Sequence, residues 1–210
     1  MKAAIFDLDG TLIDSMGVWD KIGRDFLAAR GIKAPDDLSR IVKNLSFSET
    51  AGYYIRRFSL PDQSEQLIAI WNAMAYREYA GNIELKPGVR EYLIKLKGNN
   101  IRMGIATATS RELVEAVLRR HEIFSFFQTV VTIDDIGKGK EYPDIFLLAA
   151  QKLNVNPRDC IVFEDCLHAI NGAKLAGMKV LAVYDLASAH EKPEMERIAD
   201  GYIQDFRELI

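Results

Sequence analysis

The sequence of 210 residues has few cysteines, no basic cluster and no long apolar run. Its two cysteines, with only a short apolar stretch before Asp7 and no secretory leader, predict reduced thiols in a cytoplasmic protein. A formal net charge of -3, with no basic run longer than two residues, argues against nucleic acid as a partner. The longest apolar runs, such as 145–150, are too short to cross a bilayer. These absences predict a soluble protein with neither a nucleic-acid nor a membrane partner.

Length and composition are those of a globular chain. Hydrophobic residues make up 49% of the sequence and charged residues 27%, which is enough apolar material for a sizeable core. A chain of this length fits one domain with an insertion or two small domains. Nothing in the sequence indicates an assembly, so we expect a monomer.

The spacing of apolar residues divides the chain into two kinds of structure. Residues 3–6 form a short strand, and helical spacing then continues for about seventy residues. Strands alternate with helices from residue 85 onward; we expect them at 101–106, 129–132, 160–163, 179–183 and near 202–203. Such alternation predicts an α/β fold, with a Rossmann-like parallel sheet flanked by helices on both faces. An all-helical domain over 15–84 is inserted into a discontinuous core domain of residues 1–14 and 85–210.

Three local features are expected inside the helical insert. Trp19 and Trp71 lie at helical spacing with other apolar residues, which predicts that both belong mainly to the core of the insert. Asp62 and Glu65 have the spacing of a capping box before the last helix of the insert. A short helix after Pro35 is expected to bury an apolar face that consists of Leu38, Ile41, Val42 and Leu45.

Polar side chains occur where four of the predicted strands end: Asp7 with Asp9, Thr107, Lys140 in a following loop, and Glu164 with Asp165. The carboxyl ends of parallel strands share one edge of a sheet, so these side chains are expected to converge. Carboxylates suit Mg²⁺, while lysine and a threonine hydroxyl suit a phosphate. A carboxylate can also be a covalent nucleophile. Together these residues predict metal-assisted phosphoryl transfer through an aspartyl-phosphate.

In these motifs the sequence resembles the haloacid dehalogenase (HAD) superfamily over essentially the whole chain. Residues 7–11 (DLDGT) are similar to the first family motif and 105–109 (IATAT) to the second. Lys140 resembles the third motif and 163–165 (FED) the fourth. The helical insert, which ends at 86–88 (KPG), is similar to the C1 cap of the phosphoglucomutase-like subgroup. The resemblance therefore implies a HAD core domain and a C1 cap domain.

The resemblance also implies roles for the acidic residues. Asp7 would attack phosphorus and ligate Mg²⁺. Asp9 would be the general acid and base, with its backbone carbonyl on the metal. Asp165 would bind Mg²⁺ directly, and Glu164 would support it directly or through water.

The phosphoryl group would be held by residues from three of the motifs. By the same resemblance, Thr107 and Lys140 would bind it, and Lys140 would also neutralise Asp7. Backbone N–H groups of Leu8, Asp9 and Ala108 would complete the cradle.

Two positions near the third and fourth motifs depart from the family pattern. The third motif usually reads Lys-Pro, whereas Glu141 follows Lys140 here, and Lys138 stands nearby as an alternative lysine. Cys166 follows the fourth motif where the family often has serine, and it is expected to be an inert thiol. Neither departure removes a charge that the chemistry needs.

The insert favours a phosphatase of a small phosphomonoester over two alternatives. Sugar phosphomutases of the subgroup carry a cap histidine where Trp19 stands, and a cap lysine where 67–76 contains no basic residue. They place an arginine near Phe47. The second alternative, a non-catalytic binding protein on the same fold, is disfavoured because every charged motif residue is present. Trp19, Asn44, Phe47 and Ser48 are the candidate substrate contacts of the cap.

Overall fold

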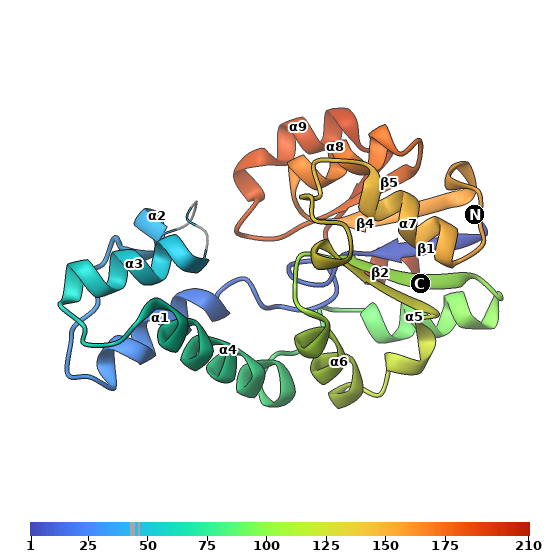
Figure 1. Ribbon diagram of the computed structural model, residues 1–210. Helices are drawn as coiled ribbons and strands as arrows, with labels where there is room; N and C mark the ends of the chain where they lie inside the picture. Colours follow the sequence, from blue (N-terminus) through green and yellow to red (C-terminus); the bar gives the residue numbers. More distant parts are fainter. Residues whose placement is uncertain (43–44, 46) are drawn as a thin grey trace. The chain divides into compact units, whose positions relative to one another are not determined.

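The computed structural model describes residues 1–42, 45 and 47–210, apart from the side chain of Phe47. The chain divides into two compact units. The sheet unit consists of residues 1–16 and 83–210, and the helical unit of residues 17–82 (Figure 1). No helix in the described part of the chain is both long and apolar enough to span a bilayer.

The sheet unit is built on a six-stranded parallel sheet with the order β3-β2-β1-β4-β5-β6. The strands are β1 (Ala3–Phe6), β2 (Arg102–Thr107), β3 (Thr129–Thr132), β4 (Cys160–Glu164), β5 (Lys179–Val183) and β6 (Gly201–Ile203). All four residues of β1 are fully buried, because this central strand is covered on both faces. A strand in that position needs the continuous apolar run that the sequence supplies. The predicted fold class, a parallel α/β sheet with an inserted helical unit, is confirmed.

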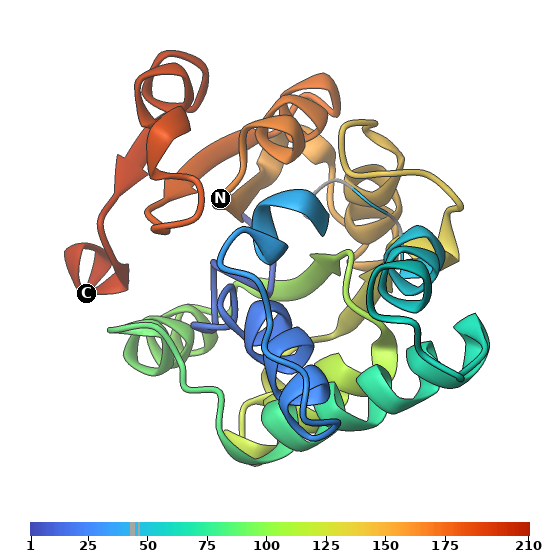
Figure 2. The ribbon, with the colours of Figure 1, turned by 90° about the vertical axis from the view of Figure 1, so that its left-hand side faces the viewer.

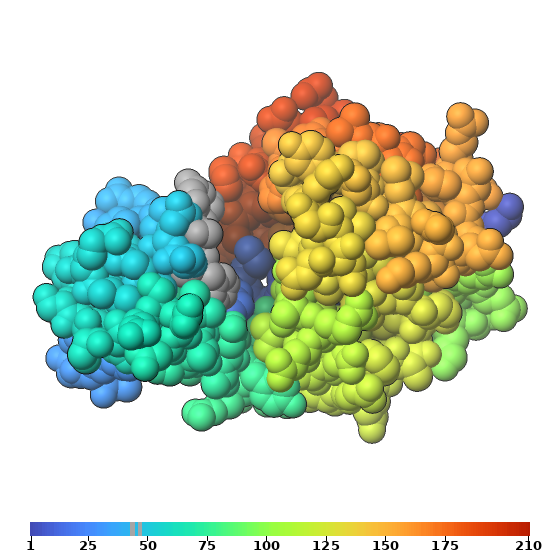
Figure 3. Space-filling view, in the orientation of Figure 1, coloured from blue at the N-terminus to red at the C-terminus, as the bar shows by residue number. Residues whose placement is uncertain are grey.

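Helices cover both faces of this sheet (Figures 1 and 2). The helices are α5 (Val89–Gly98), α6 (Arg111–Arg120), α7 (Asp144–Lys152), α8 (Leu167–Leu175) and α9 (Lys192–Ile198). Short 3-10 helices lie at Phe124–Phe126, Ile133–Asp135, Pro157–Asp159, Ala189–Glu191 and Phe206–Leu209. In the space-filling view, the yellow surface of the segment after β3 lies between the green surface of α6 and the orange-red surface of the C-terminal third (Figure 3).

The two faces of the sheet have different cores. On one face, small and branched side chains such as Ile5 and Val162 pack against α7, α8 and Met195 of α9. The other face is aromatic: the rings of Phe6 and Phe163 stack with centroids 4.6 Å apart, and Tyr92 of α5 lies edge-on to Phe163. Aromatic pairs of this kind bury large areas and hold neighbouring elements in fixed geometry.

Strand order reverses beside β1, which fixes the position of the chemistry. The chain runs from β1 outward to β3 on one side and returns to β4 on the other. Phe6 is in register with Phe163 of β4, and the backbone N–H of Asp7 donates to the carbonyl oxygen of Phe163 at 2.9 Å. The residue after β1 therefore lies beside the last residue of β4, at the switch point where open α/β sheets bind ligands.

The helical unit has an aromatic core of its own. It consists of α1 (Val18–Ala28), α2 (Leu38–Val42), α3 (Phe47–Phe58) and α4 (Ser64–Gly81). The ring centroid of Trp71 lies 5.7 Å from that of Phe26 and 5.0 Å from that of Tyr54, and both pairs are edge-to-face. Residues from α1, α3 and α4 thus meet in one cluster, and Trp71 is buried as predicted.

Three residues that were expected to be buried in this unit are exposed. Trp19 is 37% exposed, because it lies in the first turn of α1, where Val18 carries the buried stripe that continues through Ile22. Ile41 and Leu45 are also exposed. The helix α2 is only five residues long, and Leu38 is its only buried residue.

The predicted capping box was displaced by one residue. The helix α4 begins after Gln63, whose backbone N–H donates to the side-chain oxygen of Gln66 at 2.7 Å. Asp62 instead accepts a hydrogen bond from Arg30 of the preceding segment at 3.2 Å. Asp62 is therefore engaged in an ion pair with Arg30, and Gln63 is the N-cap of α4.

Candidate active site

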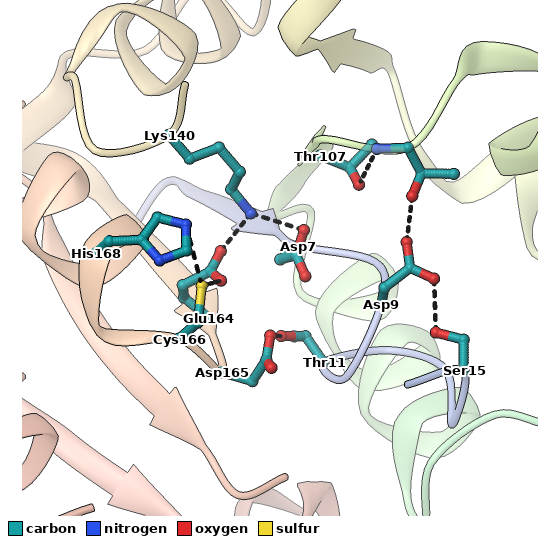
Figure 4. A network of polar contacts seen from close by, with 11 residues as sticks. Asp7, Asp9, Thr11, Ser15, Thr107, Lys140, Glu164, Asp165, Cys166 and His168 are labelled. Atoms are coloured by element: carbon teal, nitrogen blue, oxygen red, sulfur yellow. Dashed lines mark hydrogen bonds and ion pairs between the residues drawn. The ribbon is translucent and has the colours of Figure 1, made fainter. Parts of the chain in front are cut away.

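A buried ammonium joins two carboxylates at the switch point (Figure 4). Lys140 Nζ donates to Asp7 Oδ1 at 2.7 Å and to Glu164 Oε2 at 2.6 Å. Asp7 follows β1, Glu164 ends β4, and Lys140 lies in the loop between β3 and α7. Lys140 is 6% exposed, and both carboxylates are buried. Three residues far apart in sequence are thus brought together, as their positions at strand ends predicted.

The charges at this site do not balance. Asp7, Glu164 and Asp165 are buried carboxylates, and Lys140 is the buried cation among them. Burial, together with the charge of Asp7, raises the pKa of Glu164 despite the opposing effect of Lys140. Burial and the charges of Glu164 and Asp7 likewise raise the pKa of Asp165. Burial alone would lower the pKa of Lys140, but Asp7 and Glu164 outweigh it and keep the ammonium charged.

The turn after Asp9 is shaped around Asp165. Gly10 has φ of 78°, a conformation that glycine adopts without steric cost. A Cβ at this position would lie 2.5 Å from Asp165 Oδ2, so the site also needs the missing side chain. The next residue, Thr11, donates from Oγ1 to Asp165 Oδ1 at 3.1 Å. Gly10 therefore leaves room for the Asp165 side chain, and Thr11 hydrogen-bonds to it.

Asp9 is oriented by two hydroxyl groups. Ser15 Oγ donates to Asp9 Oδ1 at 2.5 Å, and Thr109 Oγ1 donates to Asp9 Oδ2. The backbone N–H of Thr109 in turn donates to Thr107 Oγ1 at 3.1 Å, which ties this loop to the buried end of β2. Sequence reasoning did not single out Ser15 or Thr109. The hydroxyl pattern of the second motif was a signal for Thr109, whereas no pattern marked Ser15.

The remaining predicted core residues lie around this cluster. Leu8 is fully buried between the two aspartates, and Ala108 is exposed at the end of β2. Lys138, the alternative lysine, instead pairs with Asp144 at 2.9 Å on the surface. Glu141 is exposed. The lysine that contacts Asp7 is Lys140.

The acid cluster has the donor chemistry of a divalent cation site. One carboxylate oxygen from each of Glu164 and Asp165 lies within 4.8 Å of the other and of Cys166 Sγ. Carboxylates are hard oxygen ligands of the kind that Mg²⁺ prefers, and a cation here would offset the excess negative charge. Cys166 Sγ donates to Glu164 Oε1 at 3.2 Å, and burial raises the pKa of its thiol. A raised pKa favours the protonated thiol, which is a weak nucleophile, and the inertness of Cys166 stays a prediction.

The candidate substrate contacts lie in the helical unit. Trp19 of α1 and Ser48 of α3 are exposed. Phe47 is the first residue of α3, and its side chain lies outside the described part of the structure, as does Asn44. Their role stays a prediction.

An open cavity of about 520 Å³ lies at the opposite end of the sheet, before the strands begin. It is lined by Lys2, Asn100, Arg102, Asn154 and Asp159 among others. None of the predicted site residues lines it, so it is separate from the acid cluster.

Comparison with known proteins identifies the family. The chain matches the model of haloacid dehalogenase-like hydrolases over residues 1–177. It is 31% identical over 180 residues to a phosphorylated carbohydrates phosphatase of Thermotoga maritima, covering 85% of this chain and 83% of that protein. It is 30% identical over 190 residues to the beta-phosphoglucomutase of Bacillus subtilis, covering 87% and 83%. The crystal structure of CbbY from Rhodobacter sphaeroides in complex with phosphate matches with a TM-score of 0.83 at 25% identity, covering 100% and 96%.

The chain therefore belongs to the haloacid dehalogenase-like hydrolases. The recognition from its motifs is confirmed. The predicted enzyme class, a phosphoric monoester hydrolase, agrees with the phosphatases among its relatives.

Proposed function

We propose that the protein is a Mg²⁺-dependent phosphatase that hydrolyses a small phosphomonoester through an aspartyl-phosphate on Asp7. The observation that carries the proposal is the buried Lys140 ammonium between Asp7 and Glu164. Phosphoryl transfer needs mainly positioned groups and charge stabilisation, and this arrangement supplies both.

Asp7 is suited to attack phosphorus. Lys140 holds its Oδ1, while Oδ2 makes no hydrogen bond to any other described residue. In the first step a bond forms between an Asp7 oxygen and phosphorus, the bond to the leaving oxygen breaks, and Asp9 donates a proton to that oxygen. In the second step Asp9 takes a proton from water, the water oxygen bonds to phosphorus, and the Asp7 carboxylate is released.

Residues around Asp7 would bind the transferring group. The Thr107 hydroxyl and the Lys140 ammonium would contact its oxygens, together with backbone N–H groups of Leu8, Asp9 and Ala108. Lys140 would also neutralise the charge of Asp7, which otherwise repels an anionic substrate. Donors that are already in place cost little reorganisation during the reaction.

The proposed metal ligands are Asp7, the backbone carbonyl of Asp9 and Asp165, with Glu164 in support. The hydrogen bonds of Glu164 to Lys140 and Cys166 favour that supporting role. Mg²⁺ would supply positive charge to the phosphoryl oxygens. The excess of buried carboxylates over buried ammonium groups supports a divalent cation, and hard oxygen donors favour magnesium.

Several observations bear on the substrate. One relative is named as a phosphatase of phosphorylated carbohydrates and another as a hexitol phosphatase, so we propose a phosphorylated sugar or a similar small metabolite. A relative named beta-phosphoglucomutase makes a sugar phosphomutase the second candidate. Trp19 at the position of the mutase histidine, and the absence of basic residues in 67–76, favour water as the phosphoryl acceptor.

We further propose that the helical unit acts as the cap domain and the sheet unit as the core domain. The unit limits at residues 16 and 83 support this assignment. The monomeric state and the cytoplasmic location stay predictions from the sequence.

The test is phosphate release from a panel of sugar phosphates, nucleotides and small phosphoesters, with Mg²⁺ and with EDTA. Asp7→Asn serves as the control because it keeps the size of the side chain and removes its nucleophilic charge. We expect metal-dependent release that is lost in Asp7→Asn.

Other outcomes would contradict the proposal. Interconversion of a sugar 1-phosphate and 6-phosphate without net release would identify a mutase. Release that persists in EDTA would remove the metal from the proposal, and release by Asp7→Asn at the wild-type rate would remove the nucleophile.

A further inference from the structure

Lys86 is a second lysine with little solvent exposure, and it lies outside the four motifs. Its side chain is 10% exposed, and Nζ donates to the Gly10 carbonyl oxygen at 2.7 Å, the Tyr184 carbonyl oxygen at 2.5 Å and Asp185 Oδ2 at 3.0 Å. An ammonium has three N–H donors, and here each has an oxygen partner. A partly buried lysine with every donor satisfied is held in one orientation, so it is able to fix the segments that it contacts.

The three oxygens belong to segments that surround the proposed site. Gly10 lies between Asp9 and Thr11, in the loop after β1. Tyr184 and Asp185 follow β5. The backbone N–H of Lys86 donates to the Leu12 carbonyl oxygen at 2.9 Å. Lys86 therefore contacts residues 7–13, the first-motif loop, through both its side chain and its main chain.

The hydrogen bond from Lys86 to the Gly10 carbonyl lies between two residues of the proposed site, Asp9 and Thr11. Gly10 has a positive φ, and its backbone N–H donates to the Ile13 carbonyl oxygen at 3.0 Å within the loop. The Gly10 carbonyl oxygen is held by Lys86 from outside the loop. The residue before it, Asp9, is the proposed acid and base. The residue after it, Thr11, hydrogen-bonds Asp165, the proposed Mg²⁺ ligand.

We propose that Lys86 is a positioning residue that holds the loop of Asp9, Gly10 and Thr11 in its reactive geometry through the Gly10 carbonyl. This role rests on the proposed phosphatase function. Asp185 has a different part: its buried carboxylate balances the Lys86 charge and in turn accepts the backbone N–H of Ala187 at 2.9 Å. Lys86 therefore positions the loop, and the ion pair with Asp185 compensates the charge of Lys86.

The hydrogen bond of Lys86 to Gly10 and its ion pair with Asp185 can be removed separately by substitution. Lys86→Met alone leaves the buried Asp185 carboxylate without its partner, and a buried unpaired charge destabilises a fold severely. The double variant Lys86→Met with Asp185→Asn removes both charges and the bond to Gly10. Asp185→Asn alone keeps that bond. Lys95→Met is the matched control, because Lys95 is exposed and donates to the carbonyl oxygens of Leu209 and Ile210 at 2.9 and 3.0 Å, near the C-terminus.

Four quantities are measured for each variant: kcat, KM, Mg²⁺ affinity by titration calorimetry, and Tm. For the double variant we expect kcat to fall about tenfold or more, as for the loss of a hydrogen bond from a charged group. Its Mg²⁺ affinity should fall as well, while KM stays within about threefold, because the substrate-binding groups remain. Asp185→Asn should keep kcat within about threefold of wild type while lowering Tm. Lys95→Met should leave kcat, KM and Mg²⁺ affinity unchanged.

The proposal is overturned by a folded double variant whose kcat and Mg²⁺ affinity both match wild type. It is also overturned if Asp185→Asn lowers kcat as much as the double variant, since charge balance alone would then explain the effect. Failure of the phosphatase proposal is distinguishable, because it appears as an inactive wild-type protein. Calorimetry needs no turnover, so a difference in Mg²⁺ affinity between wild type and the double variant still decides whether Lys86 holds the loop.

Discussion

The carboxylate of Asp9 is held by one hydroxyl on each of its oxygens. Ser15 contacts Oδ1 and Thr109 contacts Oδ2. A group that transfers a proton must be oriented toward the reacting atom, and misplacement by about 1 Å can cost a hundredfold in rate. If Asp9 is the proposed acid and base, the two hydroxyls are expected to affect the rate without contacting phosphorus.

This arrangement predicts that Thr109→Val lowers kcat about tenfold or more, because a hydrogen bond to a charged group is worth about 1.5–3 kcal/mol. Valine keeps the shape of threonine and removes only the hydroxyl. Thr109→Ser retains the hydroxyl and is expected to keep most of the activity. Steady-state kinetics on the best substrate of the panel measures both. Equal rates for the valine and serine variants would show that the hydroxyl is not needed.

At the scale of elements, α8 approaches the loop that carries Lys140 closely. A Cβ at Gly172 of α8 would collide with the carbonyl oxygen of Lys140 and lie 3.0 Å from that of Tyr142. Both atoms are backbone, so they can give way only if the loop moves. The helix and the loop are thus in contact because this position has no side chain.

We therefore expect Gly172→Ala to displace Lys140, destabilise the protein by about 1–3 kcal/mol and reduce kcat about tenfold or more. Gly98→Ala in α5 is the matched control, because its Cβ would meet nothing within 4 Å. That substitution should be neutral or stabilising by about 0.5 kcal/mol. Thermal unfolding and phosphate release measure both variants. Normal activity in Gly172→Ala would mean that the loop adapts without moving the ammonium.

The elements that the sequence predicted well are those with a continuous or a periodic apolar pattern. The β1 run is apolar throughout because both faces are buried, and parallel order then brings Asp7 beside Glu164 without further information. Contacts formed by loops could not be predicted in the same way. Ser15 and Lys86 reach the first-motif loop through turns whose geometry depends on tertiary packing, so no spacing rule marks them. The displaced cap at Gln63 has the same cause, because the ion pair of Asp62 involves Arg30, which lies in the turn after α1 and is distant in sequence.

At the scale of the whole molecule, the acid cluster imposes a cost on folding that a bound cation would relieve. Asp7, Glu164 and Asp165 are buried together with Lys140, so the folded state holds more negative than positive charge in a medium that screens poorly. Anything that binds the folded state and not the unfolded state stabilises the former by mass action. The stability of the sheet unit should therefore depend on Mg²⁺.

This argument predicts opposite effects of Asp165→Asn with and without metal. In EDTA the variant should melt higher than wild type, by about 2–4 °C for each kcal/mol of relieved repulsion, because asparagine is neutral and can still accept from Thr11. With Mg²⁺ at about 100 times its Kd the wild-type protein should gain about 2.7 kcal/mol, and the variant far less. Scanning calorimetry of both proteins in both buffers measures the four melting temperatures. A variant that melts lower than wild type in EDTA would show that Asp165 stabilises the metal-free fold, and the unbalanced charge would then not explain the metal dependence.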